Sequence, residues 1–550
     1  MGKAAQARQE QHDELGDARP LAAERQTAPE TAPAPGAGPA AEPVDARDDL
    51  PVFRRPARRA AYVGNGVYAR PRRGGWRRWS RVLGMLLLVA VVLGGVRAAA
   101  VFVASDNQVI VYAQNQQAAR VDLATAVPRS PYIFGMNVFP ATGTQAQDGA
   151  YGFMPYDART LAGLTSAGVT MLRFPGGNWG EEHSASYEQI NAFLQVAEQT
   201  HATPLMQVRL HGNTPEAAAA LVHYTNNPHD PVRQQRYPNA PFLPVHYWVI
   251  GNEPDLFGGG YGVNQYVSDF IAFARAMKTA DPAIQILGPE ISQYNGPNAA
   301  PRDDTGTPWL EGFLRGVAAY ERAHGVRLLD GVTVHRYPFT TTATSDSLLL
   351  ASASEWRYAL PPLRDEVRQM MGRDLPVGIT EINTNALGGA APPAGPAALW
   401  WAETLGTLIE GQATYVDFFA ARGIEHPQAL LAMDGQPTPF ARVMELYRNM
   451  APDAIAVNGA ASPLALFAAT NQAHDRLTLM LINTSADPVT ALIAPQRAFS
   501  GWSRQEVTVA PYAITCVVLR HGAGGLAYSY APGAGVNGQA GQIQRQTLPR

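Results

Sequence analysis

Short apolar runs recur through the middle of the chain, and each is followed by a longer segment with the periodicity of an amphipathic helix. The short runs are typical of buried strands, because they are rich in β-branched and aromatic residues and are bounded by Gly, Pro, Asn or Asp. Successive runs start 35 to 47 positions apart, which is the length of a strand, a helix and two loops. Eight strands are predicted, beginning near Pro131, Val169, Pro204, Val245, Ala283, Leu329, Pro376 and Thr414. Between them the pattern predicts helices, for example over residues 187–199, 264–280 and 310–324.

This strand–helix repeat over residues 126–450 predicts an α/β fold, a (β/α)8 TIM barrel. The alternative is a doubly wound open sheet, which needs a Gly-rich phosphate-binding turn after its first strand. The residues found there, Gly-Met-Asn-Val at 135–138, do not make such a turn. In a barrel, catalytic groups are expected where the strands end and the βα loops begin.

Further β-type sequence precedes the barrel region and follows it. Residues 451–521 hold short strands broken by Asn, Asp, Pro and Gly, a pattern that predicts a C-terminal antiparallel β-sandwich. These strands are expected at 464–467, 477–483, 505–509 and 513–519. Residues 105–125 contain a further run, at 108–112, which we expect to pair with the sandwich. The Gly-, Gln- and Ala-rich residues 522–550 are predicted to form a disordered tail.

The N-terminal region has a different composition. Residues 1–81 are predicted to be a disordered cytoplasmic segment, rich first in Ala, Pro and acidic residues and then, from 51, in arginine, with ten arginines and no acid. The apolar run at 82–96 by itself would also fit a buried core helix, because about 20 residues are needed to span a bilayer. Counted over 82–104, with the arginines on one side only, it predicts a transmembrane anchor in the lipid bilayer. This topology places the N-terminus in the cytoplasm and the catalytic domain outside it.

The remaining composition excludes several classes of protein. A formal net charge of −3 gives no argument for nucleic-acid binding by the whole chain. Cys516 is the only cysteine, so no intrachain disulfide can form, and its apolar surroundings predict a small buried side chain.

Two glutamates lie at the predicted ends of two strands. Glu253 follows Asn252 at the end of the fourth strand, and Glu381 ends the seventh, 381 − 253 = 128 positions later. Because parallel strands of a barrel end at one mouth, both carboxylates are expected to face it. A retaining glycosidase needs such a pair, one as acid/base and one as nucleophile. We expect Glu253 to be the acid/base, Glu381 the nucleophile, and Asn252 a hydrogen-bond donor to a sugar hydroxyl.

The motifs resemble those of glycoside hydrolase clan A, which comprises retaining (β/α)8 enzymes. The resemblance rests on Gly-Asn-Glu-Pro at 251–254 and Thr-Glu at 380–381. The stretch 251–257 looks like the β-glucuronidase and heparanase family, whereas Leu-Arg-Phe-Pro-Gly-Gly-Asn at 172–178 looks like the α-L-arabinofuranosidases. The resemblance implies that Arg173 holds Glu381 ionised and that His335 and Tyr337 lie near the nucleophile. No metal-ligand spacing is evident and this chemistry needs no cofactor.

Other polar residues at strand ends have two interpretations each. Asn178 could contact sugar or cap its loop, and Asn137 could line the site or belong to the core. Glu290, at the end of the fifth strand, is a weaker rival to Glu253 because no Asn precedes it. Side chains that could stack on sugar or pack within βα loops are Trp179, His183, His211, Phe257 and Tyr261.

These features predict a membrane-anchored retaining glycoside hydrolase that cleaves O-glycosidic bonds of an extracytoplasmic polysaccharide or glycoconjugate. The alternative is a non-catalytic carbohydrate-binding or scaffolding protein on the same barrel, since a fold alone does not prove an activity. An intracellular metabolic barrel enzyme conflicts with the predicted anchor and lacks a Gly-rich phosphate loop after its last strands.

Overall fold

The computed structural model describes residues 108–113, 118–141, 153–296, 299–339, 345–386, 391–422, 429–459, 461, 463–496, 501–534 and 540–550. The chain divides into two compact units, Met1–Arg81 and Val82–Arg550, and every described residue belongs to the second. The predicted anchor at 82–104 and the segment before it lie outside the described residues. Within the described part, none of the helices combines the length and the apolar character needed to cross a membrane.

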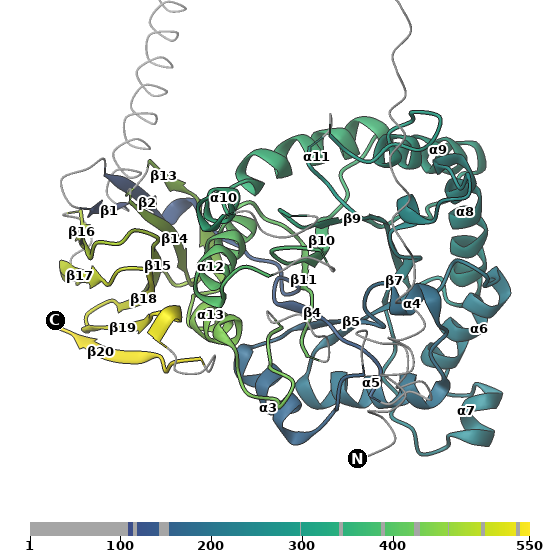
Figure 1. Cartoon of the computed structure of the whole chain (residues 1–550), viewed down its shortest axis with the longest axis horizontal. Coiled ribbons are helices and arrows are strands. Elements are labelled where there is room, and N and C mark those ends of the chain that lie inside the picture. The colour runs from purple at the N-terminus through teal and green to yellow at the C-terminus, as the bar shows by residue number, and fades with distance from the viewer. Residues whose placement is uncertain are drawn as a thin grey trace, which may run out of the picture. The chain divides into compact units, whose positions relative to one another are not determined.

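Eight parallel strands close into a barrel, and helices surround it (Figure 1). All eight predicted strands are present, so the predicted TIM barrel is confirmed. In chain order they are β4 (Gly135–Asn137), β5 (Met171–Phe174), β6 (Thr203–Val208), β7 (Tyr247–Ile250), β8 (Gln285–Ile291), β9 (Gly331–Arg336), β10 (Val377–Ile382) and β11 (Tyr415–Phe418). The barrel closes where Asp417 of β11 pairs with Gly135 of β4.

Local sequence signals mark the ends of several helices. Ser186 forms a capping box with Gln189 at the start of α5, and Thr214 caps α6, which has Pro215 in its first turn. Gly325, in the left-handed conformation, ends α9. The main helices are α3 (Ala158–Ala167), α4 (Trp179–Glu182), α5 (Tyr187–Thr200), α6 (Pro215–Asn226), α7 (Pro231–Arg236), α8 (Val263–Ala280), α9 (Trp309–His324), α10 (Asp346–Ser352), α11 (Trp356–Met371), α12 (Ala394–Glu410) and α13 (Pro439–Arg448).

The barrel interior changes from apolar to polar toward the ends of its strands. A buried apolar cluster made of Met171, Leu205, Val249, Leu287 and Tyr415 fills the lower lumen. Side chains two positions apart on a strand point to the same side. The next inward positions on three of these strands are therefore Arg173, Gln207 and Asp417, all of them buried. This polar layer is the floor of the candidate active site.

Two antiparallel sheets form the C-terminal sandwich, as predicted. The larger has the order β20-β19-β18-β15-β14-β12-β3 and the smaller β13-β2-β1-β16-β17. Their strands are β1 (Gln108–Ala113), β2 (Ala119–Asp122), β3 (Val127–Pro128), β12 (Asp453–Ile455), β13 (Val457–Asn458), β14 (Leu464–Thr470), β15 (Arg476–Asn483), β16 (Val489–Pro495), β17 (Gln505–Val509), β18 (Ala513–Arg520), β19 (Gly525–Tyr530) and β20 (Gln544–Leu548). The run at 108–112 does pair with the sandwich, through β16. Cys516 is buried.

The prediction of disorder for residues 522–550 is wrong for two segments. Strand β19 pairs with β18, and β20 pairs with β19, so both extend the larger sheet. The composition concealed these strands because their buried positions include small residues such as Gly525 and Ala527. Leu548, 4% exposed, anchors β20 in the sandwich core.

Candidate active site

Arg173, at the end of β5, is the centre of a buried polar network. Its Nη1 donates to Oε1 of Glu381 at 2.8 Å and its Nη2 to Oε2 of Glu290 at 2.7 Å. The same two nitrogens also donate to the Oδ1 atoms of Asn137 and Asn252, each at 2.7 Å. A planar guanidinium can hold several acceptors in fixed directions, so Arg173 fixes the relative positions of groups from four other strands or strand ends.

Glu253 and Glu381 lie next to each other at the barrel mouth. One oxygen of each and a ring nitrogen of His335 lie within 4.8 Å of one another. His335 Nδ1 is 3.0 Å from Oε1 of Glu253 and 3.6 Å from Oε2 of Glu381. The hydroxyl of Tyr337 donates to the same Oε2 of Glu381 at 2.9 Å. The side chains of Glu253 and Glu381 retain 12% and 5% exposure, so both carboxylates can be reached from the mouth.

The backbone is irregular at the two strand ends that carry Glu253 and Glu381. Glu253 adopts φ 46°, in the left-handed region, and its backbone N–H donates to the carbonyl of Glu290 at 3.0 Å. Gly251, two residues earlier, has φ 80°, a conformation that glycine adopts readily. Strand β10 shifts register between Ile379 and Glu381, an irregularity of the kind that redirects side chains next to active sites.

The charges in this network stabilise one another. Burial opposes the charged form of His335, but Glu381, Glu253 and Glu290 raise its pKa to about 10. Burial also disfavours ionised Glu290, but Arg173 and His335 lower the pKa of that carboxyl to about 2. For Glu381, burial raises the pKa above its ordinary value, while His335 and Arg173 oppose this effect. At neutral pH the network therefore contains an arginine and an imidazolium facing three carboxyl groups.

Glu290, the weaker rival to Glu253 in the sequence, lies beneath the site. Its side chain is fully buried and bonds to Arg173, to His335 Nε2 at 3.3 Å and to Oγ1 of Thr380 at 2.7 Å. With no exposed surface, Glu290 has no route to a substrate. Its position suits a counter-ion that keeps Arg173 and His335 charged.

The structure brings most of the predicted site residues together, at different depths. Asn252 is 1% exposed and donates from Nδ2 to Oδ1 of Asn178, which is exposed at the mouth. Asn137 is fully buried and donates to the carbonyl of Thr380 at 2.9 Å, so it supports the floor of the site. Tyr337 is 7% exposed and lies beside Glu381.

The aromatic candidates divide into two groups. Trp179 is buried, and the ring of His183 stacks against it at 5.0 Å between centroids. Phe257 lies between His211 and Tyr261, with centroid separations of 5.4 and 5.2 Å. The second group comes from the loops after β6 and β7, on the Glu253 side of the mouth.

Two buried carboxyl groups near the site, those of Asp417 and Glu181, were not among the predicted site residues. The contact of Thr380 with Glu290 could not be read from the sequence either, although Thr380 belongs to the Thr-Glu motif. Asp417 is fully buried with no hydrogen-bond partner for its carboxyl among the described residues, and burial raises its pKa well above the ordinary value. Glu181 accepts hydrogen bonds from the backbone of Leu210, at 3.1 Å, and of His211. Burial raises the pKa of Glu181 to about 7.

Glu253, His335 and Glu381 are also the one group of described residues whose ligand atoms lie close enough together to hold a metal ion. A histidine ligates a metal through an unprotonated ring nitrogen. Both ring nitrogens of His335 already face a carboxylate oxygen, Nδ1 at 3.0 Å from Glu253 and Nε2 at 3.3 Å from Glu290. The donor set therefore fits a hydrogen-bond network better than a metal site.

Comparisons with known proteins agree with this site and fold. The family model of glycoside hydrolase family 44 matches residues 233–340, which include Glu253, Glu290 and His335. No curated protein sequence matches the chain.

Several solved structures share the fold at low sequence identity. A family 44 xyloglucanase from Paenibacillus polymyxa is 15% identical with a TM-score of 0.52, and the match covers 73% of this chain and 98% of that chain. A family 51 arabinofuranosidase from Xanthomonas axonopodis pv. citri is 15% identical with a TM-score of 0.55, covering 75% of this chain and 100% of that chain. A family 51 α-L-arabinofuranosidase from Bifidobacterium longum is 16% identical with a TM-score of 0.54, covering 74% and 99%. The resemblance to clan A glycosidases is thus confirmed, and the chain carries a glycoside hydrolase domain on a (β/α)8 barrel.

Proposed function

We propose that this protein is a retaining glycoside hydrolase that works by double displacement, with Glu381 as nucleophile and Glu253 as acid/base. The observation that carries the proposal is the approach of the two carboxyl groups, whose nearest oxygens lie within 4.8 Å. Retaining enzymes keep these groups about 5–5.5 Å apart, whereas inverting enzymes leave room for a water with a wider separation. The different surroundings of the two glutamates support the assignment of roles.

In the first step, a carboxylate oxygen of Glu381 attacks the anomeric carbon while Glu253 gives its proton to the leaving glycosidic oxygen. The bond between that oxygen and the anomeric carbon breaks, and a glycosyl ester forms on Glu381. In the second step, Glu253 takes a proton from water, whose oxygen attacks the same carbon and releases Glu381. Two displacements at one carbon restore its original configuration.

The neighbours of Glu381 favour its role as nucleophile. Its Oε1 is held by Arg173 and its Oε2 by Tyr337, so the carboxylate is oriented by donors on both oxygens. Hydrogen bonds from charged or buried donors stabilise the ionised form that attack requires. Glu253 lacks an arginine partner and is the more exposed of the two, which suits a group that exchanges protons with a leaving group and with water.

The substrate side of the site is formed by Asn252 and Asn178. Their hydrogen-bonded amides lie between the buried guanidinium of Arg173 and the exposed mouth. Amide groups at this depth suit sugar hydroxyls, and a hydroxyl contact that strengthens as positive charge develops on the sugar would stabilise the transition state.

The proposed substrate is an extracytoplasmic polysaccharide or glycoconjugate, and the proposed location is the cell membrane. Support comes from the sequence alone: the apolar segment 82–104 and the ten arginines at 51–81. Membrane flotation of the full chain, compared with a variant lacking 82–104, tests this part. If the full chain and the variant both remain in the soluble fraction, the proposed membrane location is contradicted.

The catalytic proposal is tested with the full chain, its Glu381→Gln variant and Glu198→Gln, which changes an exposed glutamate on α5. Each is assayed on aryl α-arabinofuranoside, β-glucuronide, β-xyloside, β-glucoside and β-galactoside, with the product anomer followed by NMR. We expect hydrolysis of at least one glycoside with retained configuration, and a loss of about 10⁴-fold or more in Glu381→Gln alone. Inverted product, or full activity of Glu381→Gln, contradicts the mechanism. Sugar binding without hydrolysis would favour the non-catalytic alternative.

A further inference from the structure

The carboxylate of Glu181 lies between two loops of the barrel mouth and takes no part in the mechanism described so far. Glu181 belongs to α4 and is 8% exposed. Its Oε1 accepts from the backbone N–H of Leu210 at 3.1 Å and from that of His211, both in the loop after β6. The backbone N–H of Asn252, at the end of β7, is a further donor to this carboxylate. One carboxylate therefore joins two loops, and the next residue of the second loop is Glu253.

Close packing places Glu181 between these loops. Helix α4 lies so near the end of β5 that a Cβ on Gly180 would be 2.7 Å from the carbonyl oxygen of Pro175. On the other side, a Cβ on Gly251 would be 3.7 Å from Oε2 of Glu181 and 3.2 Å from the side chain of Leu210. The absence of side chains at these two glycines lets α4 and the ends of β6 and β7 meet around the carboxylate.

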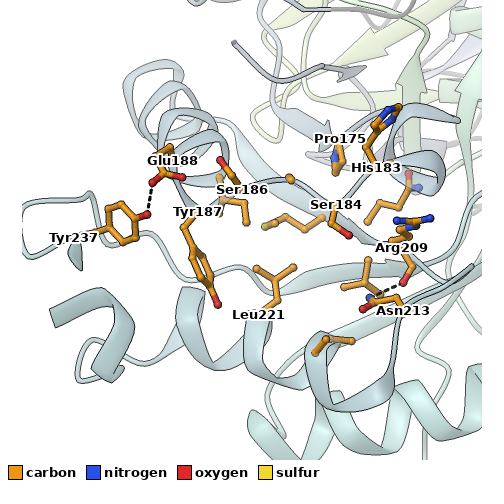
Figure 2. A pocket seen from close by; sticks show the side chains of 18 of the residues that line it. Pro175, His183, Ser184, Ser186, Tyr187, Glu188, Arg209, Asn213, Leu221 and Tyr237 are labelled. Carbon is orange, nitrogen blue, oxygen red and sulfur yellow. Dashed lines mark hydrogen bonds between the residues drawn. The ribbon is translucent and has the colours of Figure 1, made fainter. Parts of the chain in front are cut away.

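The loop after β6 is held by its own hydrogen bonds. Figure 2 shows Arg209 and Asn213 in this loop, where Nδ2 of Asn213 donates to the carbonyl of Arg209 at 2.8 Å. The backbone N–H of Asn213 also donates to the carbonyl of Leu210 at 3.2 Å. Glu181 therefore joins the end of β7 to a loop that is already closed on itself.

The end of β7 needs support because Glu253 is in the left-handed region, with φ 46°. For residues other than glycine, such a conformation costs free energy and persists where the surroundings fix it. On the side of β8, the N–H of Glu253 donates to the carbonyl of Glu290, and Oδ1 of Asp255 accepts from the N–H of Ser292 at 2.9 Å. On the side of β6, Glu181 holds the residue immediately before Glu253.

The donors around Glu181 require a carboxylate. An ionised carboxylate only accepts hydrogen bonds, so both of its oxygens can face backbone N–H groups. Glutamine has nearly the same shape, but an NH2 group replaces one oxygen and would face a donor. Burial raises the pKa of Glu181 to about 7, while the N–H groups of His211 and Leu210 and the charge of Arg209 stabilise the ionised form.

We propose that Glu181 is a positioning residue for the acid/base, because it fixes the backbone from which Glu253 gives its proton to the leaving oxygen. The inference rests on the proposed function, in which Glu253 is the acid. Glu381 is held separately, by Arg173 and Tyr337, so the loss of Glu181 should impair proton donation more than nucleophilic attack. A displacement of about 1 Å at a catalytic group can cost about 10²-fold in rate.

Leaving-group dependence tests the proposal. The full chain, Glu181→Gln and Glu182→Gln are compared by kcat/KM on phenyl and 2,4-dinitrophenyl glycosides of the sugar that the protein hydrolyses, at about pH 8, where Glu181 is ionised. Phenol needs a proton to leave, whereas dinitrophenol needs little help. Glu181→Gln should lose about 10-fold or more on the phenyl glycoside and less than about 2-fold on the other. Glu182→Gln, at the exposed neighbour on α4, should lose neither.

The ratio of the two rates does not depend on how much of a variant is folded, so a loss of stability alone cannot change it. If Glu181→Gln does not fold, Glu181→Asp takes its place, because it keeps the charge but cannot reach all the donors. A double variant with Glu253→Gln supplies a second measurement. If Glu181 acts through Glu253, adding Glu181→Gln to Glu253→Gln should cost little more on the phenyl glycoside.

Equal losses on the two glycosides, or no loss on either, overturn the proposal. So do losses that multiply in the double variant, because Glu181 would then act independently of Glu253. If Glu253→Gln discriminates between the leaving groups and Glu181→Gln does not, only this inference fails. If Glu253→Gln does not discriminate either, Glu253 is not the acid, and the proposed function fails first.

Discussion

Arg173 donates from Nη1 to Oε1 of Glu381 across 2.8 Å, with both side chains almost completely buried. Residue 173 comes from the second barrel strand and residue 381 from the seventh, so the contact spans the lumen. Through it, the orientation of the proposed nucleophile depends on a cation that is itself fixed by Glu290 and two asparagines.

Replacing Arg173 should damage both stability and activity. Arg173→Gln leaves Glu381 and Glu290 buried without their cation, and breaking a buried ion pair from one side costs about 3–5 kcal/mol of unfolding free energy. Arg173→Lys keeps the positive charge but lacks the planar guanidinium that holds several acceptors at once. It should therefore recover part of the lost stability and a smaller part of the lost turnover. Urea unfolding and kcat measure the two effects. Unfolding curves of Arg173→Gln that match the original protein would contradict the network described.

Glu253→Gln should separate substrates by their leaving groups. Proton donation contributes about 10²–10⁴-fold, so natural glycosides with poor leaving groups should lose that much in kcat. Activated aryl glycosides, which need little protonation, should be affected less in the first step. A plot of rate against leaving-group pKa checks this, with Glu198→Gln as control. A uniform loss over all leaving groups would argue against Glu253 as the acid.

Tyr337→Phe should shift the pH dependence of activity. The hydroxyl of Tyr337 stabilises the ionised form of Glu381, so its removal should raise the pKa of Glu381. Because the nucleophile must be ionised, the acidic limb of the kcat/KM profile should move to higher pH. A loss of about 10-fold in kcat should accompany it. Tyr358→Phe, at a residue 79% exposed, is the control and should change neither. If the acidic limb does not move, the ionisation of a group other than Glu381 controls it.

His335 should make stability fall at alkaline pH. Its folded-state pKa of about 10 exceeds the ordinary value of 6.5, so the imidazolium stabilises the folded state fully below about pH 6.5. This stabilisation is lost as the pH rises toward 10. The free energy of unfolding should therefore decline over this range, and less steeply in His335→Gln. His246→Gln, at an exposed histidine, should keep the original slope. Parallel slopes in all three proteins would rule out a charged His335.

Leu548→Ala tests whether the C-terminal residues belong to the sandwich. Leu548 packs in the sandwich core, so shortening its side chain to that of alanine should cost about 2 kcal/mol or more of unfolding free energy. Leu348→Ala, at a leucine 58% exposed on α10, should cost much less. Equal effects of the two substitutions would restore the prediction of a disordered tail.

The barrel was predictable because its signals are local. Each strand is a short apolar run with turn residues at its ends, and all eight predicted strands are present. The pair Glu253 and Glu381 was predictable for the same reason, since barrel topology brings all strand ends to one mouth. The tail was not, because Gly525 and Ala527 fill buried positions without the large apolar side chains that mark a strand.

The sequence by itself determined the fold class, the two glutamates and the residues near them, since these depend on periodicity and on position along each strand. Only the tertiary structure decided how deeply each side chain is buried and which partners it contacts. It buried Glu290 and Asn137 beneath the site and left Glu253 and Asn178 accessible. Burial and pairing are set by residues far apart in the chain, and these contacts determine whether a carboxyl or a guanidinium is a counter-ion or is free to meet a ligand.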